Sequence, residues 1–197
     1  MTSETKNTPV DIYCFGYDRV LFDEDTPYWN SLYKGVKHLI KNEHKKGRIM
    51  AVFSTRENND IVGAAVLQVL EENEIYECFN GVSIGKGKQG ECIVGHLIER
   101  IASYCDSIGI TVGTTHIFNN EEYPEFKQYQ RPYKFYFTDR QCGLSEYDLW
   151  EADGSVRTSS NRTVVVNENP TRPEHSEAEE KGDQNHSGIC QPTTANQ

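Results

Sequence analysis

Short apolar runs alternate with longer amphipathic stretches along the first 140 residues of the chain. Residues 10–17 (VDIYCFGY) form a run that is rich in β-branched and aromatic side chains, has the length of a strand and stops at Asp18-Arg19. Comparable runs cover residues 48–54, 79–84, 110–118 and 134–137. We therefore predict five buried strands.

The stretches between these runs carry apolar residues at three- and four-residue spacing, which is the period of a helix with one buried face. The first helix is predicted to open at Pro27 and to end at Gly47, the second to follow a cap at Asn58 or Asn59, and the third to follow the turn GKGKQG at residues 85–90. Strands alternating with helices of this length indicate a mostly parallel sheet covered on both faces. We predict a three-layer α/β domain over residues 10–153.

The two ends of the chain have a different composition. The first nine residues are polar, and from about residue 154 the sequence is dominated by Ser, Thr, Asn, Glu, Gln and Pro, with one apolar island at residues 164–166. Such segments bury too little apolar surface to offset the entropy of ordering the chain. We predict a disordered segment at residues 1–9 and a disordered polar tail at residues 154–197.

Charge and cysteine content narrow the possible surroundings and partners. The formal net charge of −10 disfavours binding to nucleic-acid phosphate and to anionic lipid, so we expect neither nucleic acid nor a membrane as a partner. No apolar run approaches the roughly 20 residues that span a bilayer, and the first residues lack the layout of a signal peptide. The six cysteines form no CxxC pair. We expect an intracellular, cytoplasmic protein with reduced thiols.

Polar residues follow three of the predicted strands. They are Gly16-Tyr17-Asp18, Ser54-Thr55-Arg56 and Asn119-Asn120-Glu121, and Lys86 and Lys88 lie in the turn before the third helix. Ligand sites of open parallel sheets lie at the carboxyl ends of the strands. We therefore predict that Gly16, Ser54 and Asn119 converge at one edge of the sheet.

This order of polar segments resembles the haloacid dehalogenase (HAD)-like superfamily, and in particular its small magnesium-dependent phosphatases with little or no cap. The family pattern is a first strand ending in Asp-x-Asp-x-Thr/Val-Leu, a second ending in Ser or Thr, a lysine before a helix, and a strand ending in paired acids. The matching positions over residues 10–140 are Gly16-Tyr17-Asp18-Arg19-Val20-Leu21, Ser54, Lys88 or less well Lys86, and Asn119-Asn120.

The chain departs from this pattern at the residues that carry the chemistry. Gly16 stands where the resemblance requires the nucleophilic aspartate, and Asn119 and Asn120 stand where it requires the acids that help to hold magnesium. Moving the register so that Asp18 is the nucleophile puts Val20 at the place of the second acid. The resemblance then implies a degenerate site that needs no cofactor and binds Mg²⁺ weakly if at all, with Asp18 as the remaining metal ligand. The residues left to bind phosphate are Ser54, Thr55 and Lys88.

Each of these residues also has an explanation without a ligand. Asp18 and Asn119-Asn120 fit ordinary turns, Ser54 and Thr55 fit a cap, and the lysines fit a solvated surface. His116, which lies in the predicted strand before Asn119, fits a packed core. We therefore keep three hypotheses: a pseudophosphatase that binds a phosphorylated ligand or a protein partner, a Mg²⁺-dependent phosphatase with unusual ligands, and a purely structural or assembly protein.

Overall fold

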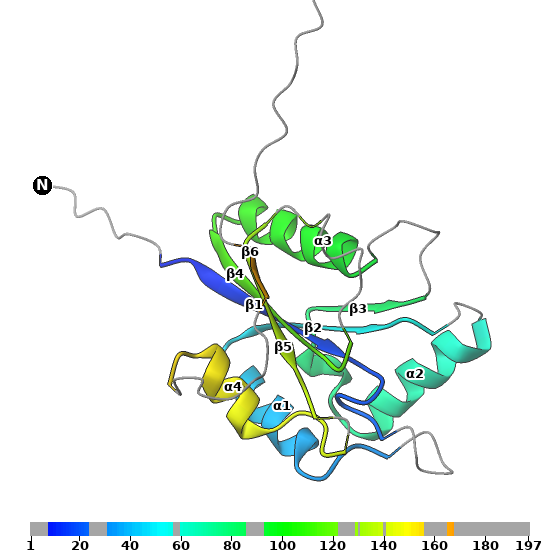
Figure 1. The fold of residues 1–197 in the computed structure, drawn as a ribbon. Coiled ribbons are helices and arrows are strands. Elements are labelled where there is room, and N and C mark those ends of the chain that lie inside the picture. Colours follow the sequence, from blue (N-terminus) through cyan, green and yellow to red (C-terminus); the bar gives the residue numbers. More distant parts are fainter. Residues whose placement is uncertain are drawn as a thin grey trace, which may run out of the picture.

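Six strands form one sheet in the computed structural model, which describes residues 8–23, 31–56, 60–85, 93–121, 129, 131–139, 141–155 and 165–167. The strand order is β3-β2-β1-β4-β5-β6 (Figure 1). The first five strands are parallel, and β6 is antiparallel to β5. The strands are β1 (Val10–Gly16), β2 (Ile49–Ser54), β3 (Gly81–Ile84), β4 (Val112–Asn119), β5 (Tyr133–Phe137) and β6 (Val165–Asn167).

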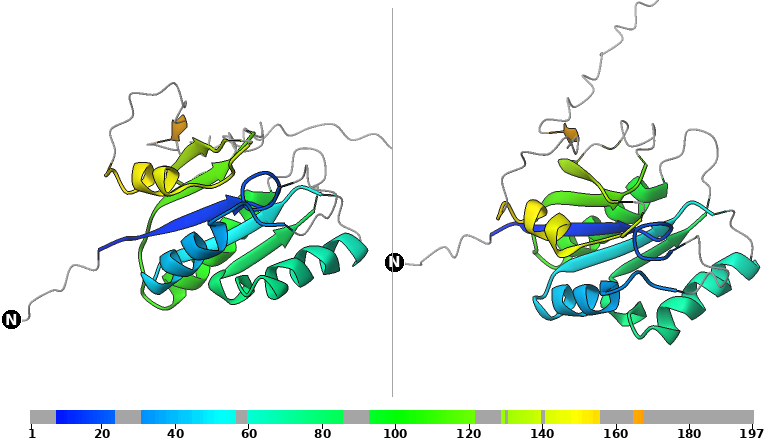
Figure 2. Two further views of the ribbon diagram at one scale, coloured as in Figure 1. Left: turned by 90° about the horizontal axis from the view of Figure 1, so that it is seen from below. Right: turned by 60° about the horizontal axis from the view of Figure 1, so that its bottom comes forward.

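Helices cover both faces of this sheet. α3 (Ile93–Ser107) packs on one face, and α1 (Val36–Lys45), α2 (Asp60–Glu72) and α4 (Glu146–Ala152) pack on the other (Figure 2). The 3₁₀ turn η1 (Tyr76–Cys78) links α2 to β3. The predicted three-layer α/β fold with a mostly parallel sheet is therefore confirmed, and its order 3-2-1-4-5 is that of doubly wound, Rossmann-like sheets.

The continuous apolar run of β1 follows from its central position. Tyr13 and Phe15 point into the cluster beneath α1, α2 and α4, whereas Ile12 and Cys14 point into the cluster beneath α3. All four side chains are at most 2% exposed. A strand that is buried on both faces has no solvent side, so its sequence shows no alternation of apolar and polar residues.

The first helix is shorter than predicted, because α1 begins at Val36 rather than at Pro27. Gly35 precedes it with a φ of 88°, a left-handed conformation that interrupts a right-handed helix. Leu32, which fits the helical period, instead pairs with Phe22 in an isolated β-bridge. Residues 24–30 lie outside the described part of the chain.

A fourth helix, α4, has no counterpart in the prediction. Ser145 caps it by accepting from the backbone N–H of Asp148, while the Asp148 carboxylate accepts from the backbone N–H of Ser145. With only seven residues it offers little periodicity to detect. None of the helices in the described ranges is both long and apolar enough to cross a membrane.

The prediction of a disordered tail over residues 154–197 is wrong for three residues. Val165–Asn167, which overlap the apolar island at 164–166, form β6 and pair with Tyr133, Lys134 and Phe135 of β5. Without β6, β5 would end the sheet with an open edge, and a short strand from the tail satisfies that edge. The remaining tail residues beyond Ser155 lie outside the described part of the chain.

Candidate functional site

The carboxyl ends of β1, β2 and β4 lie side by side and enclose a pocket. Gly16 pairs with Phe53, the neighbour of Ser54, and Phe15 pairs with Phe118, the neighbour of Asn119. The pocket has a volume of about 280 Å³, at the lower limit of small-molecule sites. We call it the site pocket, and its lining consists of Gly16, Tyr17, Asp18, Arg19, Phe53, Thr55, Arg56, Asn119, Asn120 and Glu121.

Asp18 is held in this pocket by two neighbours from the end of β2. Its Oδ2 accepts a hydrogen bond from Ser54 Oγ at 2.8 Å, and its Oδ1 accepts one from Arg56 Nε at 2.5 Å. The Ser54 hydroxyl in turn accepts from the backbone N–H of Arg56 at 3.3 Å. The three residues form a closed ring of contacts, which fixes both the carboxylate and the guanidinium.

Gly16 and Asn119 occupy the same corner of the pocket. A Cβ atom added at Gly16 would lie 2.3 Å from Asn119 Oδ1 and 3.1 Å from a methyl of Val20. Asn119 is only 2% exposed, and its Nδ2 donates to the backbone carbonyl of Glu121 at 2.6 Å. The amide therefore fills the space into which a side chain at position 16 would project.

A tight turn after β1 shapes the other wall. Tyr17 continues the strand with a hydrogen bond from its N–H to the carbonyl of Phe53 at 2.7 Å, and Arg19 then adopts a φ of 58°. This left-handed conformation costs a non-glycine residue about 1–2 kcal/mol. The bond from the Arg19 N–H to the carbonyl of Phe22, at 2.9 Å, closes the turn. The strained backbone brings Arg19 into the pocket lining.

Most of the residues predicted from sequence meet here. Gly16, Asp18, Thr55, Asn119 and Asn120 line the pocket, and Ser54 reaches it through Asp18. Lys88 lies outside the described residues, as does Lys86. Whether this group of residues binds a ligand stays a prediction.

The sequence analysis placed Arg56 and Glu121 among the polar residues that follow the strands, but it assigned no role to them or to Arg19. A signal for Arg56 does exist in the sequence. Asp18 lies two residues beyond the end of β1, and Arg56 lies two residues beyond the end of β2. Parallel neighbours that end together bring such opposite charges into contact, so the pair could have been derived from the strand ends alone.

The described residues of the pocket do not fit a magnesium ion. Mg²⁺ prefers octahedral oxygen ligands that include carboxylates. Asp18 and Glu121 are the carboxylates of the described lining, and both oxygens of Asp18 already accept hydrogen bonds. Gly16 has no side chain, and the Asn119 amide is neutral. In the part of the chain that the structure describes, no group of three His, Cys, Asp or Glu residues could hold a metal.

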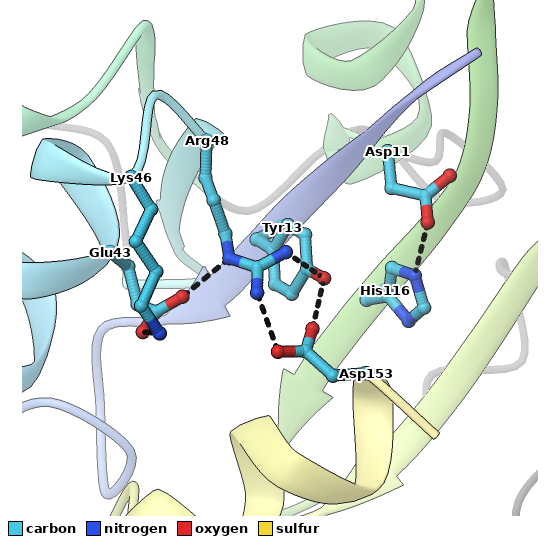
Figure 3. A network of polar contacts seen from close by, with 7 residues as sticks. All are labelled: Asp11, Tyr13, Glu43, Lys46, Arg48, His116 and Asp153. Carbon is cyan, nitrogen blue, oxygen red and sulfur yellow. Dashed lines mark hydrogen bonds and ion pairs between the residues drawn. The ribbon is translucent and has the colours of Figure 1, made fainter. Parts of the chain in front are cut away.

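A second polar cluster lies further along the sheet, toward the amino end of β1 (Figure 3). His116 of β4 is 2% exposed and stacks on Tyr13, with ring centroids 4.8 Å apart. Its Nε2 lies 3.1 Å from Asp11 Oδ2, and its Nδ1 lies 3.0 Å from the Tyr136 hydroxyl. Burial lowers the pKa of His116, and Asp11 opposes this shift. A neutral ring satisfies both partners by donating to Asp11 and accepting from Tyr136.

Arg48 is the centre of the other half of this cluster (Figure 3). It donates to the Tyr13 hydroxyl at 2.6 Å and to Asp153 Oδ2 at 2.5 Å, and it also pairs with Glu43. The Tyr13 hydroxyl donates to Asp153 Oδ1 at 2.8 Å. These contacts join α1, β1, the start of β2 and the end of α4. Its histidine is buried, and its polar side chains are hydrogen-bonded or ion-paired with one another. We therefore interpret the cluster as a structural junction between these elements.

The strand order and the pocket at the carboxyl ends define a doubly wound α/β protein. The sequence matches no protein-family model and no curated protein. One similar solved structure is the NMR structure of the core domain of a protein assigned as a phosphoglycolate phosphatase from Streptococcus pneumoniae TIGR4. The TM-score is 0.46 at 9% identity, over 76% of this chain and 99% of that chain. We therefore base the fold class on the strand order itself.

Proposed function

We propose that this chain is a HAD-like pseudophosphatase that binds a small phosphate-bearing ligand in the site pocket and does not transfer the phosphoryl group. The observation that carries the proposal is the contact between positions 16 and 119. The HAD resemblance puts the attacking carboxylate at Gly16, and a Cβ there would lie 2.3 Å from Asn119 Oδ1. Real Cβ contacts are never this short, so the corner is built around the absence of a side chain.

Binding is supported by what the pocket retains. Arg19 and Arg56 both line it, together with Thr55 and Asn120. Guanidinium groups and hydroxyls are the side chains that recognise phosphate oxygens, and a planar guanidinium does so with paired hydrogen bonds. A volume of about 280 Å³ suits a small phosphate ester or the terminal phosphate of a larger molecule.

Two assays on the full-length protein test this proposal. With p-nitrophenyl phosphate and Mg²⁺, we expect no turnover above the buffer rate, because the position that the resemblance gives to the attacking carboxylate is Gly16. In a thermal unfolding series with phenyl phosphate, we expect a stabilisation that grows with ligand concentration, reaching about 2.7 kcal/mol at a hundred times the Kd.

The remaining hypotheses are separate outcomes of the same assays. Mg²⁺-dependent turnover that Asp18→Asn abolishes would make the protein a phosphatase with unusual ligands. An absence of stabilisation by any phosphate compound would overturn ligand binding in this pocket and favour a structural or assembly role.

A further inference from the structure

We propose that Arg56 is the resident cation of the site pocket, so that the pocket binds phosphate-type anions without a metal ion. This inference rests on the proposed function and deepens it, since it names the group that meets the phosphate. The observation behind it is the contact between the Arg56 guanidinium and Asp18, the carboxylate that would otherwise be available to a divalent cation.

The guanidinium is fixed before any ligand arrives. Its Nε donates to Asp18 Oδ1 at 2.5 Å, and its central carbon lies 5.6 Å from the centroid of the Tyr17 ring. Asp18 is itself oriented by Ser54. The side chains of Arg56 and Asp18 are 20% and 19% exposed, so the pair is largely buried but still reached from the pocket. A cation held in this way loses little further freedom on binding a ligand.

The chemistry of arginine suits this role. Its charge is permanent in proteins, and its planar fork of N–H donors matches the oxygens of a phosphate group. A metal ion would have to displace Arg56 from Asp18. Glu121 is the one further carboxylate of the described lining, since Gly16 and Asn119 carry no charge. The described pocket therefore favours its own cation over Mg²⁺.

Two consequences follow for binding. First, phosphate affinity is independent of Mg²⁺ and indifferent to a chelator. Second, affinity is modest, because the two arginines of the lining are balanced by the carboxylates of Asp18 and Glu121. Recognition then depends on the geometry of close hydrogen bonds more than on a long-range positive field.

The test is isothermal titration of the full chain with inorganic phosphate and with phenyl phosphate, in EDTA and in excess Mg²⁺. We expect equal affinity in the two buffers for the unmodified protein. Arg56→Gln should weaken metal-free binding by about tenfold or more, the loss of one charge-assisted contact. Arg56→Lys keeps the charge and loses the paired N–H donors of the guanidinium. Its phosphate affinity should lie between that of the unmodified protein and that of Arg56→Gln.

The matched control is Arg100→Gln, since Arg100 is exposed on α3 and is no part of the pocket lining. It should bind as the unmodified protein does. Circular dichroism and thermal unfolding of each variant, Arg56→Lys included, show whether it is folded before it is titrated.

The outcomes separate this inference from the function on which it rests. Phosphate binding that requires Mg²⁺ and disappears in EDTA would overturn the role of Arg56 while leaving a phosphate-binding protein. Unchanged metal-free binding by folded Arg56→Gln would overturn it as well. Failure of both phosphate compounds to bind in either buffer would overturn the proposed function itself.

Discussion

At the scale of single residues, the site pocket depends on a side chain that is missing. Gly16 lies at the end of a regular strand, where its backbone needs no special conformation. Glycine is needed at this position for steric reasons, because Asn119 Oδ1 occupies the space that a Cβ would take. Asn119 is held by its bond to the Glu121 carbonyl, so it does not yield without losing a buried hydrogen bond.

Gly16→Ala is therefore expected to lower the free energy of unfolding by about 1–3 kcal/mol, the usual range for overpacking a filled site. Urea denaturation gives the value. A double-mutant cycle with Asn119→Ala should show that the two changes together cost less than their sum, because removal of the amide relieves the contact. Gly63→Ala in α2 is the control, since a Cβ there meets nothing within 4 Å and should stabilise the helix slightly. An unchanged stability of Gly16→Ala would mean that the corner is not filled.

At the scale of elements, the sequence patterns predicted the strands and the longer helices, because these segments have a clear arrangement of apolar residues. β1, β2 and β4 were predicted from short apolar runs of strand length, and the polar residues that follow these runs located the pocket. The start of α1 was missed because Leu32 and Trp29 continue the helical period while the left-handed Gly35 breaks the backbone. Periodicity records which face is apolar and contains little information about where the chain turns.

β6 was missed for a related reason, and it leads to a second prediction. A three-residue strand in a polar tail has almost no pattern, and its place depends on the open edge of β5. A chain that ends at residue 160 should lose about 1–2 kcal/mol of stability through the lost ladder hydrogen bonds. It should also self-associate through the uncovered edge of β5.

Chemical denaturation and sedimentation velocity measure the two effects of this truncation. The matched control ends at residue 170, which removes the following polar segment and keeps β6. It should behave as the full chain does. Equal stability and equal sedimentation of the two shortened chains would contradict the importance of the β5–β6 pairing.

At the scale of the whole molecule, a charged junction connects elements that the sequence leaves far apart. Arg48 touches Glu43 of α1, Tyr13 of β1 and Asp153 beyond α4, across 105 positions of the chain. Nothing in the sequence pairs these residues, because the partners are set by tertiary packing. The Asp18–Arg56 pair differs, since both members follow adjacent strand ends and so were within reach of sequence reasoning.

Arg48→Met should lower the free energy of unfolding by about 2–4 kcal/mol. Glu43, which is 3% exposed, would keep Lys46 as a partner but lose the second of its two cations, and removing one partner of a buried ion pair is strongly destabilising. We place the loss toward the lower end of the known range because Arg48 is 22% exposed. Lys46→Met is the control, and it should cost less than about 1 kcal/mol because its side chain is 55% exposed. Equal losses for the two variants, measured by thermal and urea unfolding, would show that Arg48 is not the centre of the junction.

The contact between Gly16 and Asn119 also restricts the order in which this sequence can change. Any substitution that gives residue 16 a side chain is penalised while the amide is in place, and a prior change at position 119 removes this penalty. That earlier step gives up the bond to the Glu121 carbonyl and gains nothing at position 16 until the second step follows. A change from this pocket to one with a nucleophile by this route thus passes through a less stable intermediate. That intermediate has neither the original packing nor the new nucleophile. Neither substitution alone therefore gives a pocket that has both a nucleophile and intact packing.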